Sequence, residues 1–351
     1  MLPRRSNPTS DTGMNQKQHR PKKDLSCPEK PWPGFWLDKP YYSFHAHCLH
    51  VYHEKLYKIA LNAGMTCPGR DGSAGTRGCI FCSGGGSGDF AVPVSGLSIE
   101  EQIRQGISLL GNKRTGSRFI AYFQAYTNTY APVSHLRRLY LQALCAPQIA
   151  GISIATRPDC LPEDVLALLS ELRCAYPDKF IWIELGLQTI HQKTADYIRR
   201  GYALPCFTDA VAALTEHGIP VIVHLILGLP GESRDDMYET VSFLNTLPVF
   251  GVKLQLLHIL RGTDLADAYM RGEVHVLERE EYISIVTGAL ERLSPKIVIH
   301  RLTGDGPRRL LLAPLWSLDK KNVLNRIHQT MRDDNIWQGK RCGKESHDTG
   351  K

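Results

Sequence analysis

Three cysteines lie within a short glycine-rich segment, where Cys67, Cys79 and Cys82 follow the spacing C-x11-C-x2-C. Thiolates are the usual protein ligands of iron–sulfur clusters, and three of them can bind three irons of a [4Fe–4S] cluster while the fourth iron stays open. Four glycines between Cys67 and Cys79, and three more shortly after Cys82, would let backbone N–H groups approach the sulfides. Arg70 and Arg77 could offset the negative charge of the cluster. The segment therefore indicates an iron–sulfur site with one open coordination position.

A structural zinc site is the alternative for these thiols. Zinc in structural sites takes four protein ligands, and the segment from Cys67 to Cys82 holds no fourth cysteine or histidine. The cluster is therefore favoured. The other cysteines have no ligand-like spacing and are interpreted as small apolar or surface residues; they are Cys27, Cys48, Cys145, Cys160, Cys174, Cys206 and Cys342.

A run of histidines lies upstream of the cysteine segment and could form a second metal site. These residues are His45, His47, His50 and His53. We favour the simpler interpretation that they belong to a partly exposed segment that leads into the first strand.

Apolar runs of strand length alternate with amphipathic stretches from about Leu56 onward. The expected strands are Tyr57–Leu61, Phe119–Tyr126, Ala150–Arg157, Phe180–Gln188, Val221–Gly228 and Val252–Leu260. The expected helices lie near residues 98–110, 133–145, 162–173, 206–217 and 234–246. Six such units in sequence predict a parallel sheet with right-handed crossovers, closed into a barrel or part of one.

The predicted strands alternate between an apolar and a polar face. In the strand from Phe180 to Gln188, one face carries only Ile and Leu, whereas the other carries Trp182, Glu184, Gly186 and Gln188. A closed eight-stranded barrel fills its interior mostly with branched apolar side chains. The alternation therefore predicts that the interior of this barrel holds a polar ligand.

The net charge of +7 resides at the two ends of the chain. Residues 1–39 carry 8 Lys and Arg against 4 Asp and Glu, residues 319–351 carry 8 against 5, and residues 40–318 carry 26 of each. This distribution excludes a uniformly basic nucleic-acid coat protein. The N-terminal residues lack an apolar signal region, and no apolar run is long enough to span a bilayer. Because clustered thiols persist in reducing compartments, we expect a cytoplasmic protein without a membrane partner.

Several motifs beside the cysteine segment resemble those of radical S-adenosylmethionine enzymes, in particular the YhcC/YtqA-like group. They are CPGRDGSAGTRGCIFC (67–82), FQAYTNTYAP (123–132), ATRPD (155–159), ELGLQT (184–189), HLILGLPGE (224–232) and HRLTGDGP (300–307). ATRPD and ELGLQ also resemble the radical domain of the elongator catalytic subunit. The resemblance covers about residues 40–335.

The resemblance implies an incomplete parallel (β/α)6 barrel with N- and C-terminal extensions. The expected domains are a disordered basic lead (1–38), the partial barrel (39–300), a C-terminal segment that packs on the barrel (301–335) and a flexible basic tail (336–351). In this family, Cys67, Cys79 and Cys82 would be the ligands of a [4Fe–4S] cluster that binds S-adenosylmethionine. One electron then cleaves the sulfonium to methionine and a 5′-deoxyadenosyl radical, which abstracts hydrogen from the substrate.

The resemblance also implies positions for S-adenosylmethionine contacts. Phe81 is expected against the adenine, and Gln124 to Asn128 occupy the place of the family's Gly-Gly-Glu methionine-binding motif, which this sequence lacks. Ser153, Arg157, Glu184 and Gln188 are candidates for ribose and carboxylate contacts, and Ile226 to Leu229 for the wall beside the adenine.

The resemblance points to RNA as the substrate, most plausibly wobble-uridine side chains in tRNA, with a one-electron donor such as flavodoxin or ferredoxin. The basic ends and Arg pairs could contribute phosphate contacts. Two alternatives stay open: radical chemistry on a small molecule or a protein side chain, and a non-catalytic iron–sulfur or zinc-binding protein.

Overall fold

The computed structural model describes residues 30–86, 88–89, 96–111 and 116–343. The described residues from Trp32 onward form one compact unit. The predicted basic lead lies outside the described residues up to position 29, and the predicted tail does so from position 344. Near the N-terminal end of the described residues, Trp36 is buried at the end of the 3-10 helix Gly34–Trp36. Near the C-terminal end, the Gln338 amide donates to the Ser294 and Ile297 carbonyls at 2.6 and 2.8 Å. The packed body therefore extends beyond both predicted boundaries.

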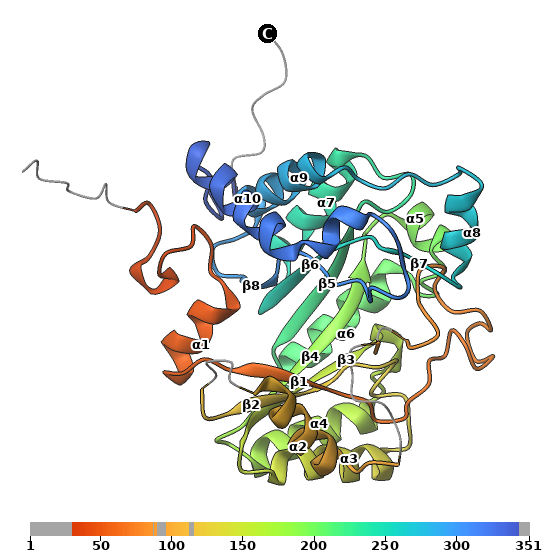
Figure 1. Ribbon diagram of the computed structural model, residues 1–351. Coiled ribbons are helices and arrows are strands. Elements are labelled where there is room, and N and C mark those ends of the chain that lie inside the picture. The colour runs from red at the N-terminus through yellow and green to blue at the C-terminus, as the bar shows by residue number, and fades with distance from the viewer. Residues whose placement is uncertain (1–29, 87, 90–95, 112–115, 344–351) are drawn as a thin grey trace, which may run out of the picture. The chain divides into compact units, whose positions relative to one another are not determined.

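Seven parallel strands form a curled, open sheet in the order β1-β2-β3-β4-β5-β6-β8 (Figure 1). They are β1 (Tyr57–Leu61), β2 (Phe119–Phe123), β3 (Ile149–Thr156), β4 (Phe180–Gln188), β5 (Val221–Leu227), β6 (Gly251–Leu256) and β8 (Val298–Arg301). Two short strands, β7 (Ile259–Leu260) and β9 (Leu311–Ala313), pair antiparallel to each other. This half-barrel confirms the predicted fold class.

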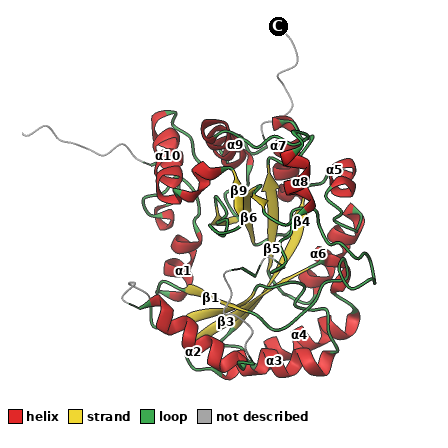
Figure 2. Ribbon diagram, turned by 45° about the vertical axis from the view of Figure 1, so that its right-hand side comes forward, coloured by secondary structure: helices red, strands yellow, loops and turns green. Residues whose placement is uncertain are grey.

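Helices cover the outer face of the sheet (Figure 2). They are α2 (Ile99–Leu110), α3 (Val133–Cys145), α4 (Glu163–Ala175), α6 (Leu204–Glu216), α7 (Arg234–Phe243) and α9 (Arg279–Arg292). Of the remaining helices, α5 (Gln192–Tyr197) follows β4, α8 (Asp264–Met270) packs on β7, and α10 (Lys320–Asp333) packs on α9. Capping boxes begin α2 and α7, since Ser98 and Ser233 each accept from the backbone N–H three residues later and Glu101 and Asp236 reach back. None of the helices among the described residues has the length and hydropathy that a membrane crossing needs.

The strand alternation predicted from the sequence is present. Ile181, Ile183, Leu185 and Leu187 on β4 are buried in the main hydrophobic core, together with residues of the surrounding helices. The opposite face of the same strand carries Glu184, Gly186 and Gln188, which line a cavity. The apolar faces therefore fix the helices on the outside and leave the polar faces to the interior.

The structure differs from the sequence prediction at the end of the sheet. A seventh parallel strand, β8, pairs with β6, although Val298–Arg301 is only four residues long and gives no extended periodic signal. The predicted sixth strand stops at Leu256, and Ile259–Leu260 turns away as β7. The predicted second strand stops at Phe123, and Tyr126 has a left-handed backbone with φ +62°. These residues leave the sheet because they form the cavity wall.

The histidine segment, which leads into β1, forms helix α1 (Phe44–Tyr52). Ser43 caps its first turn by accepting from the Ala46 N–H at 3.2 Å. His47 is buried beside Trp182 and Phe250, and its Nδ1 lies 2.9 Å from the Tyr42 hydroxyl. Among the described residues these histidines do not converge as metal ligands. The segment predicted to be partly exposed is a helix with one buried side, at Ala46, His47 and Cys48, while His50 and His53 are exposed.

Candidate functional site

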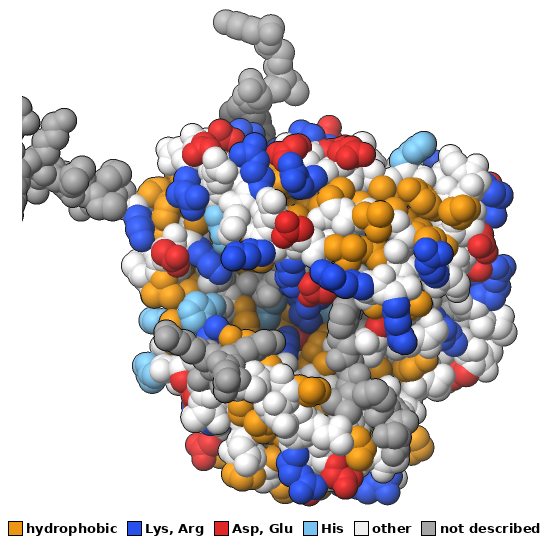
Figure 3. Space-filling model, viewed as in Figure 1, with side chains coloured by type: hydrophobic (Ala, Val, Ile, Leu, Met, Phe, Trp, Pro, Cys, Tyr) orange, Lys and Arg blue, Asp and Glu red, His pale blue; other side chains and the backbone are white. Residues whose placement is uncertain are grey.

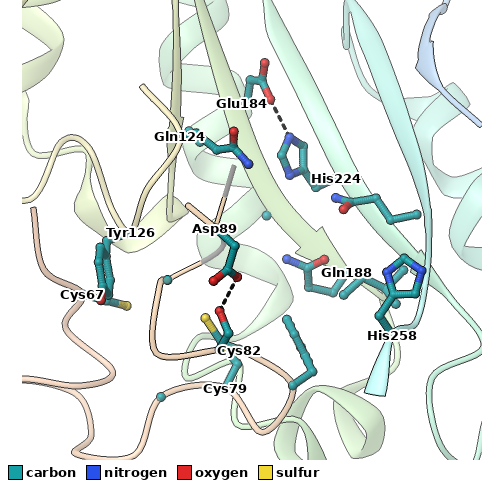
Figure 4. A pocket seen from close by; sticks show the side chains of 18 of the residues that line it. Cys67, Cys79, Cys82, Asp89, Gln124, Tyr126, Glu184, Gln188, His224 and His258 are labelled. Carbon is teal, nitrogen blue, oxygen red and sulfur yellow. Dashed lines mark hydrogen bonds and ion pairs between the residues drawn. The ribbon is translucent and has the colours of Figure 1, made fainter. Parts of the chain in front are cut away.

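A polar cavity of about 340 Å³ opens at the carboxyl ends of the strands. Each of β2 to β6 contributes to its wall, and the cysteine segment that follows β1 closes one side. Figure 4 shows the cysteines opposite the side chains of Gln124, Glu184, Gln188 and His224. Parallel barrels place their active sites at this end because the loops that follow the strands meet there.

The cysteine segment is held in place by its own backbone and by Arg70. The Arg70 guanidinium donates to the carbonyls of Cys82 and Ser83 at 2.8 and 2.7 Å. Gly78 has φ +68°, and a Cβ at this position would lie 2.8 Å from Arg70 Nε. The glycine therefore both permits the turn before Cys79 and makes room for the arginine. Arg70 lines the cavity, whereas Arg77 is exposed and pairs with Asp264 at 2.8 Å.

The three thiols face the cavity without forming a compact zinc-like site. The described residues contain one group of His, Cys, Asp and Glu whose ligand atoms all lie within 4.8 Å of one another, namely His191, Asp236 and Glu239. A tetrahedral Zn²⁺ with Zn–S bonds of about 2.3 Å holds its sulfurs about 3.8 Å apart. A cluster spreads its thiolates more widely because each binds a different iron. The arrangement of Cys67, Cys79 and Cys82 thus fits a cluster better than a zinc ion.

Glu184 is the centre of a buried polar network in the barrel interior. Its carboxylate pairs with Lys58 and Lys253 and accepts from His224 Nε2 at 2.7 Å and Ser153 Oγ at 2.5 Å. The side chain is 0% exposed. Burial alone would raise the pKa of Glu184, but the two lysines and His224 lower it well below its usual range. The carboxylate is therefore ionised and fully engaged by the chain's own donors.

His224 and Lys253 connect this network to the cavity, because both line it. Burial and the nearby Lys253 lower the pKa of His224 to about 4, so its imidazole is neutral at pH 7. Since a carboxylate can only accept, Nε2 carries the proton and Nδ1 is an acceptor. Lys253 Nζ also donates to the Tyr122 hydroxyl at 3.1 Å. The hydrogen-bond donors and acceptors of this network therefore have fixed positions from which they can contact a ligand in the cavity.

A second polar group lies beside the cysteines. Arg157 donates to both oxygens of Asp159, at 2.9 and 2.6 Å, and to the carbonyl of Arg200 at 3.0 Å. Its guanidinium lies 5.0 Å from the centre of the Tyr202 ring, and the Tyr202 hydroxyl donates to the Gly186 carbonyl. Although burial opposes the charge of Arg157, its bonds to Asp159 raise its pKa. A permanent positive charge therefore stands next to the thiols.

Most of the residues predicted from the sequence line the cavity. They are Cys67, Cys79, Cys82, Phe81, Gln124, Arg157, Glu184, Gln188 and Ile226. Asn128 and Ser153 do not. Asn128 is 0% exposed, and its Nδ2 donates to the carbonyls of Phe123 and Ala155. Ser153 is committed to Glu184. We therefore omit both from the proposed cofactor contacts.

Sequence reasoning missed several residues of the cavity wall. Lys253 lies on the polar face of β6, where the alternation places it, although it was not among the predicted site residues. Tyr122 lies on β2, whose sequence FIAYF shows no polar face. Tyr202, His258 and Arg301 also line the cavity. Tyr202 and His258 come from connecting segments that give no periodic signal, and Arg301 ends the short strand β8.

The residues present fit an iron–sulfur cluster with S-adenosylmethionine. The donor set consists of three thiols, which are iron ligands, beside a guanidinium. Gln188 Oε1 is buried and has no hydrogen-bond partner, and Gln188 lines the cavity close to Gly186. A Cβ at position 186 would lie 2.8 Å from Gln188 Nε2, so glycine keeps this part of the wall open. An unpaired acceptor on an open polar wall suits an organic ligand that carries donors.

Two family models match the chain. The model described as the Radical SAM superfamily matches residues 72–244, and that of the Radical_SAM C-terminal domain matches residues 249–333. The first includes Cys79, Cys82 and β2 to β5. The second includes β6 to β9 and α8 to α10. Together the models cover the half-barrel and the segment that follows it.

The chain is similar along most of its length to two bacterial proteins. It is 41% identical to the uncharacterized protein YtqA of Bacillus subtilis (strain 168) over 313 residues, which are 88% of this chain and 95% of YtqA. It is 36% identical to protein YhcC of Escherichia coli (strain K12) over 295 residues, 84% of this chain and 92% of YhcC. These likenesses confirm the resemblance found from the motifs.

More distant likenesses concern part of the chain or the fold alone. The tRNA uridine(34) acetyltransferase of Methanocaldococcus jannaschii is 24% identical over 193 residues, 53% of this chain and 33% of that protein. The solved structure of Elp3 from Methanocaldococcus infernus, with an N-terminal deletion, has a TM-score of 0.62 at 17% identity and covers 82% of this chain and 65% of that one. The chain therefore belongs to the radical SAM superfamily, as an enzyme whose cofactors are a [4Fe–4S] cluster and S-adenosylmethionine.

Proposed function

We propose that the enzyme uses S-adenosylmethionine in the described cavity to abstract a hydrogen atom from the side chain of a wobble uridine in tRNA. Cys67, Cys79 and Cys82 would hold the cluster. The observation that carries the proposal is the meeting of the three thiols with the polar faces of five strands in one cavity. When bound, the cluster and S-adenosylmethionine supply reductive sulfonium cleavage and hydrogen-atom abstraction.

The protein's own residues would orient the ligands and exclude water. Arg157, held by Asp159, stands where it can neutralise negative charge beside the thiols. Phe81 and Ile226 supply apolar wall, and Gln124 and Gln188 supply amide groups that can form hydrogen bonds with S-adenosylmethionine. Glu184 would act through its neighbours, because its oxygens are taken by Lys58, Lys253, His224 and Ser153. It would fix the positions of Lys253 and His224, which do face the ligand.

Support for a tRNA substrate comes from the likeness to the tRNA uridine(34) acetyltransferase over half of this chain. That likeness covers 53% of this chain and 33% of that protein, so it supports the substrate class and leaves the transformation open. We also infer that the enzyme works in the cytoplasm, where tRNA occurs and thiols stay reduced. Flavodoxin or ferredoxin is the proposed electron donor.

The cofactor assignment is tested by anaerobic reconstitution with iron and sulfide. We expect four irons per chain and release of 5′-deoxyadenosine when S-adenosylmethionine and dithionite are added. One tightly bound zinc per chain and no cleavage would contradict the assignment.

The substrate is tested separately by deleting the gene in its source organism. Total tRNA from the deletion strain is digested to nucleosides, and the wobble uridines are quantified by mass spectrometry. We expect one modified uridine to disappear and its precursor to accumulate. An unchanged nucleoside profile, with S-adenosylmethionine cleavage intact in the purified protein, would instead favour a small molecule or a protein side chain as the substrate.

A further inference from the structure

The mouth of the cavity is bordered on one side by the β7–β9 pair and the loop before β9. Leu260, Asp305, Gly306 and Pro307 from these segments line the cavity, beside Arg301 at the end of β8. The backbone N–H of Arg261 donates to the carbonyl of Leu310 at 2.7 Å, which brings the end of β7 next to the start of β9. Two segments that are about fifty residues apart in the sequence thus form one edge of the opening.

This edge carries three exposed arginines, Arg261, Arg308 and Arg309. Within the described part of the chain, their guanidinium groups form no ion pair or hydrogen bond with the protein. Asp305, the acidic residue of this loop, is already paired with Lys320 at 2.6 Å and with Arg301 at 3.8 Å. The positive charge of the edge is therefore not neutralised locally. Figure 3 shows Lys and Arg side chains gathered beside the hollow in this face.

Guanidinium groups on the edge of an active-site cavity fit the phosphates of a polynucleotide. Arginine presents a planar fork of donors that matches phosphate oxygens and stays charged at every physiological pH. An enzyme that acts on a base must take that nucleotide out of its stack, and the flanking backbone then lies at the mouth. The sequence suggested the two basic ends and the Arg pairs as sites for phosphate contacts, and Arg308 and Arg309 form one of these pairs. The arginine edge is fixed relative to the cavity.

We propose that Arg261, Arg308 and Arg309 bind the phosphates that flank the target nucleotide of tRNA. The proposal rests on the proposed function and adds to it the surface that receives the RNA backbone. These arginines would position the nucleotide, while the chemistry stays with the groups inside the cavity. They would also make binding steeply dependent on salt, because each phosphate contact releases counterions.

The test compares two triple variants of the full-length, reconstituted protein. The first is Arg261→Gln, Arg308→Gln, Arg309→Gln. The matched control is Arg104→Gln, Arg137→Gln, Arg138→Gln, which removes the same formal charge from helices α2 and α3. Binding of unfractionated tRNA is measured at several KCl concentrations between 50 and 200 mM. Cleavage of S-adenosylmethionine with dithionite in the absence of tRNA serves as the check that both variants fold and hold the cluster.

We expect the slope of log affinity against log salt concentration to be less steep by about two to three in the edge variant than in the wild type. Each phosphate contact that is lost reduces this slope by about one. The control should keep the wild-type slope, and all three proteins should cleave S-adenosylmethionine equally. Equal slopes for the wild type and the edge variant, with tight wild-type binding, would overturn the proposal alone. A wild-type protein that does not bind tRNA at 50 mM KCl would overturn the proposed substrate as well.

An acidic electron-donor protein is another partner that an arginine edge could attract. Loss of flavodoxin-driven cleavage in the edge variant, with unchanged dithionite-driven cleavage and unchanged tRNA binding, would assign the edge to that partner and overturn the proposal.

Discussion

Glu184 shows how one buried residue organises the interior of the half-barrel. A single carboxylate faces the side chains of two lysines from β1 and β6 and a neutral histidine from β5. Removing one member of a buried ion pair leaves an uncompensated charge in a medium that solvates it poorly. The residue is therefore both a structural anchor and the group that fixes Lys253 and His224 at the cavity wall.

Replacing Glu184 with Gln is expected to lower the free energy of unfolding by about 3 to 5 kcal/mol, because Lys58 and Lys253 lose their counterion. Urea denaturation monitored by circular dichroism measures the loss. The double variant Glu184→Gln, Lys253→Met should recover part of the stability, since it removes one of the two uncompensated charges. A single variant as stable as the wild type would contradict the described network.

The assignment of the cysteines as cluster ligands is also tested by a single substitution, Cys82→Ala. The variant should lose the cluster's visible absorbance and release no 5′-deoxyadenosine, because three thiolates are needed to hold the cluster and leave one iron open. Cys160→Ala is the matched control, since this buried thiol lies near the site but does not line the cavity. Retained cleavage in the Cys82 variant would contradict the ligand assignment.

At the scale of elements, helix α2 holds β1 in place and thereby fixes the start of the cysteine segment. Gly106 on this helix packs directly against Ile59 of β1, and a Cβ at position 106 would overlap Ile59 Cγ2. Glycine is otherwise a poor helix former. The close approach of helix and strand is the physical reason for its presence.

Gly106→Ala should therefore destabilise the protein by about 1 to 3 kcal/mol, although alanine favours the helix by about 1 kcal/mol, because overpacking outweighs propensity. The exposed neighbour Gln105 provides the control, since Gln105→Ala adds propensity without a clash. Thermal unfolding followed by circular dichroism compares the two. A stabilised Gly106 variant would show that the helix can move away from β1 at little cost.

At the scale of the whole packed body, histidines whose pKa is lowered by burial make stability depend on pH; they include His47, His224, His258 and His300. Burial, together with a neighbouring His50 for His47 and Lys253 for His224, lowers the pKa of both to about 4, and burial does the same for His258. In the unfolded chain a histidine titrates near 6.5. Since the unfolded state binds protons first, this contribution to stability is complete above pH 6.5 and is lost as the pH falls from 6.5 toward 4.

The free energy of unfolding should accordingly fall by about 2 kcal/mol for each of these histidines between pH 7.5 and pH 5. Urea titrations at the two pH values measure it. His258→Asn should reduce the pH dependence by about one proton. An identical pH dependence in the wild type and the His258 variant would show that His258 is not held neutral in the folded protein.

The sequence by itself determined the cysteine spacing, the first six parallel strands, five of the helices and the polar face of each strand. These features depend on residues a few positions apart, so period and spacing reveal them. The tertiary structure alone decided that Asn128 and Ser153 bond within the chain and do not line the cavity, that the histidine segment is a helix with one buried side, and that β8 completes the sheet. It also decided that Lys58 and Lys253 meet on Glu184, and that Arg261 lies beside the Arg308–Arg309 loop. Each of these outcomes depends on sheet register and curvature, which bring together segments that share no local pattern.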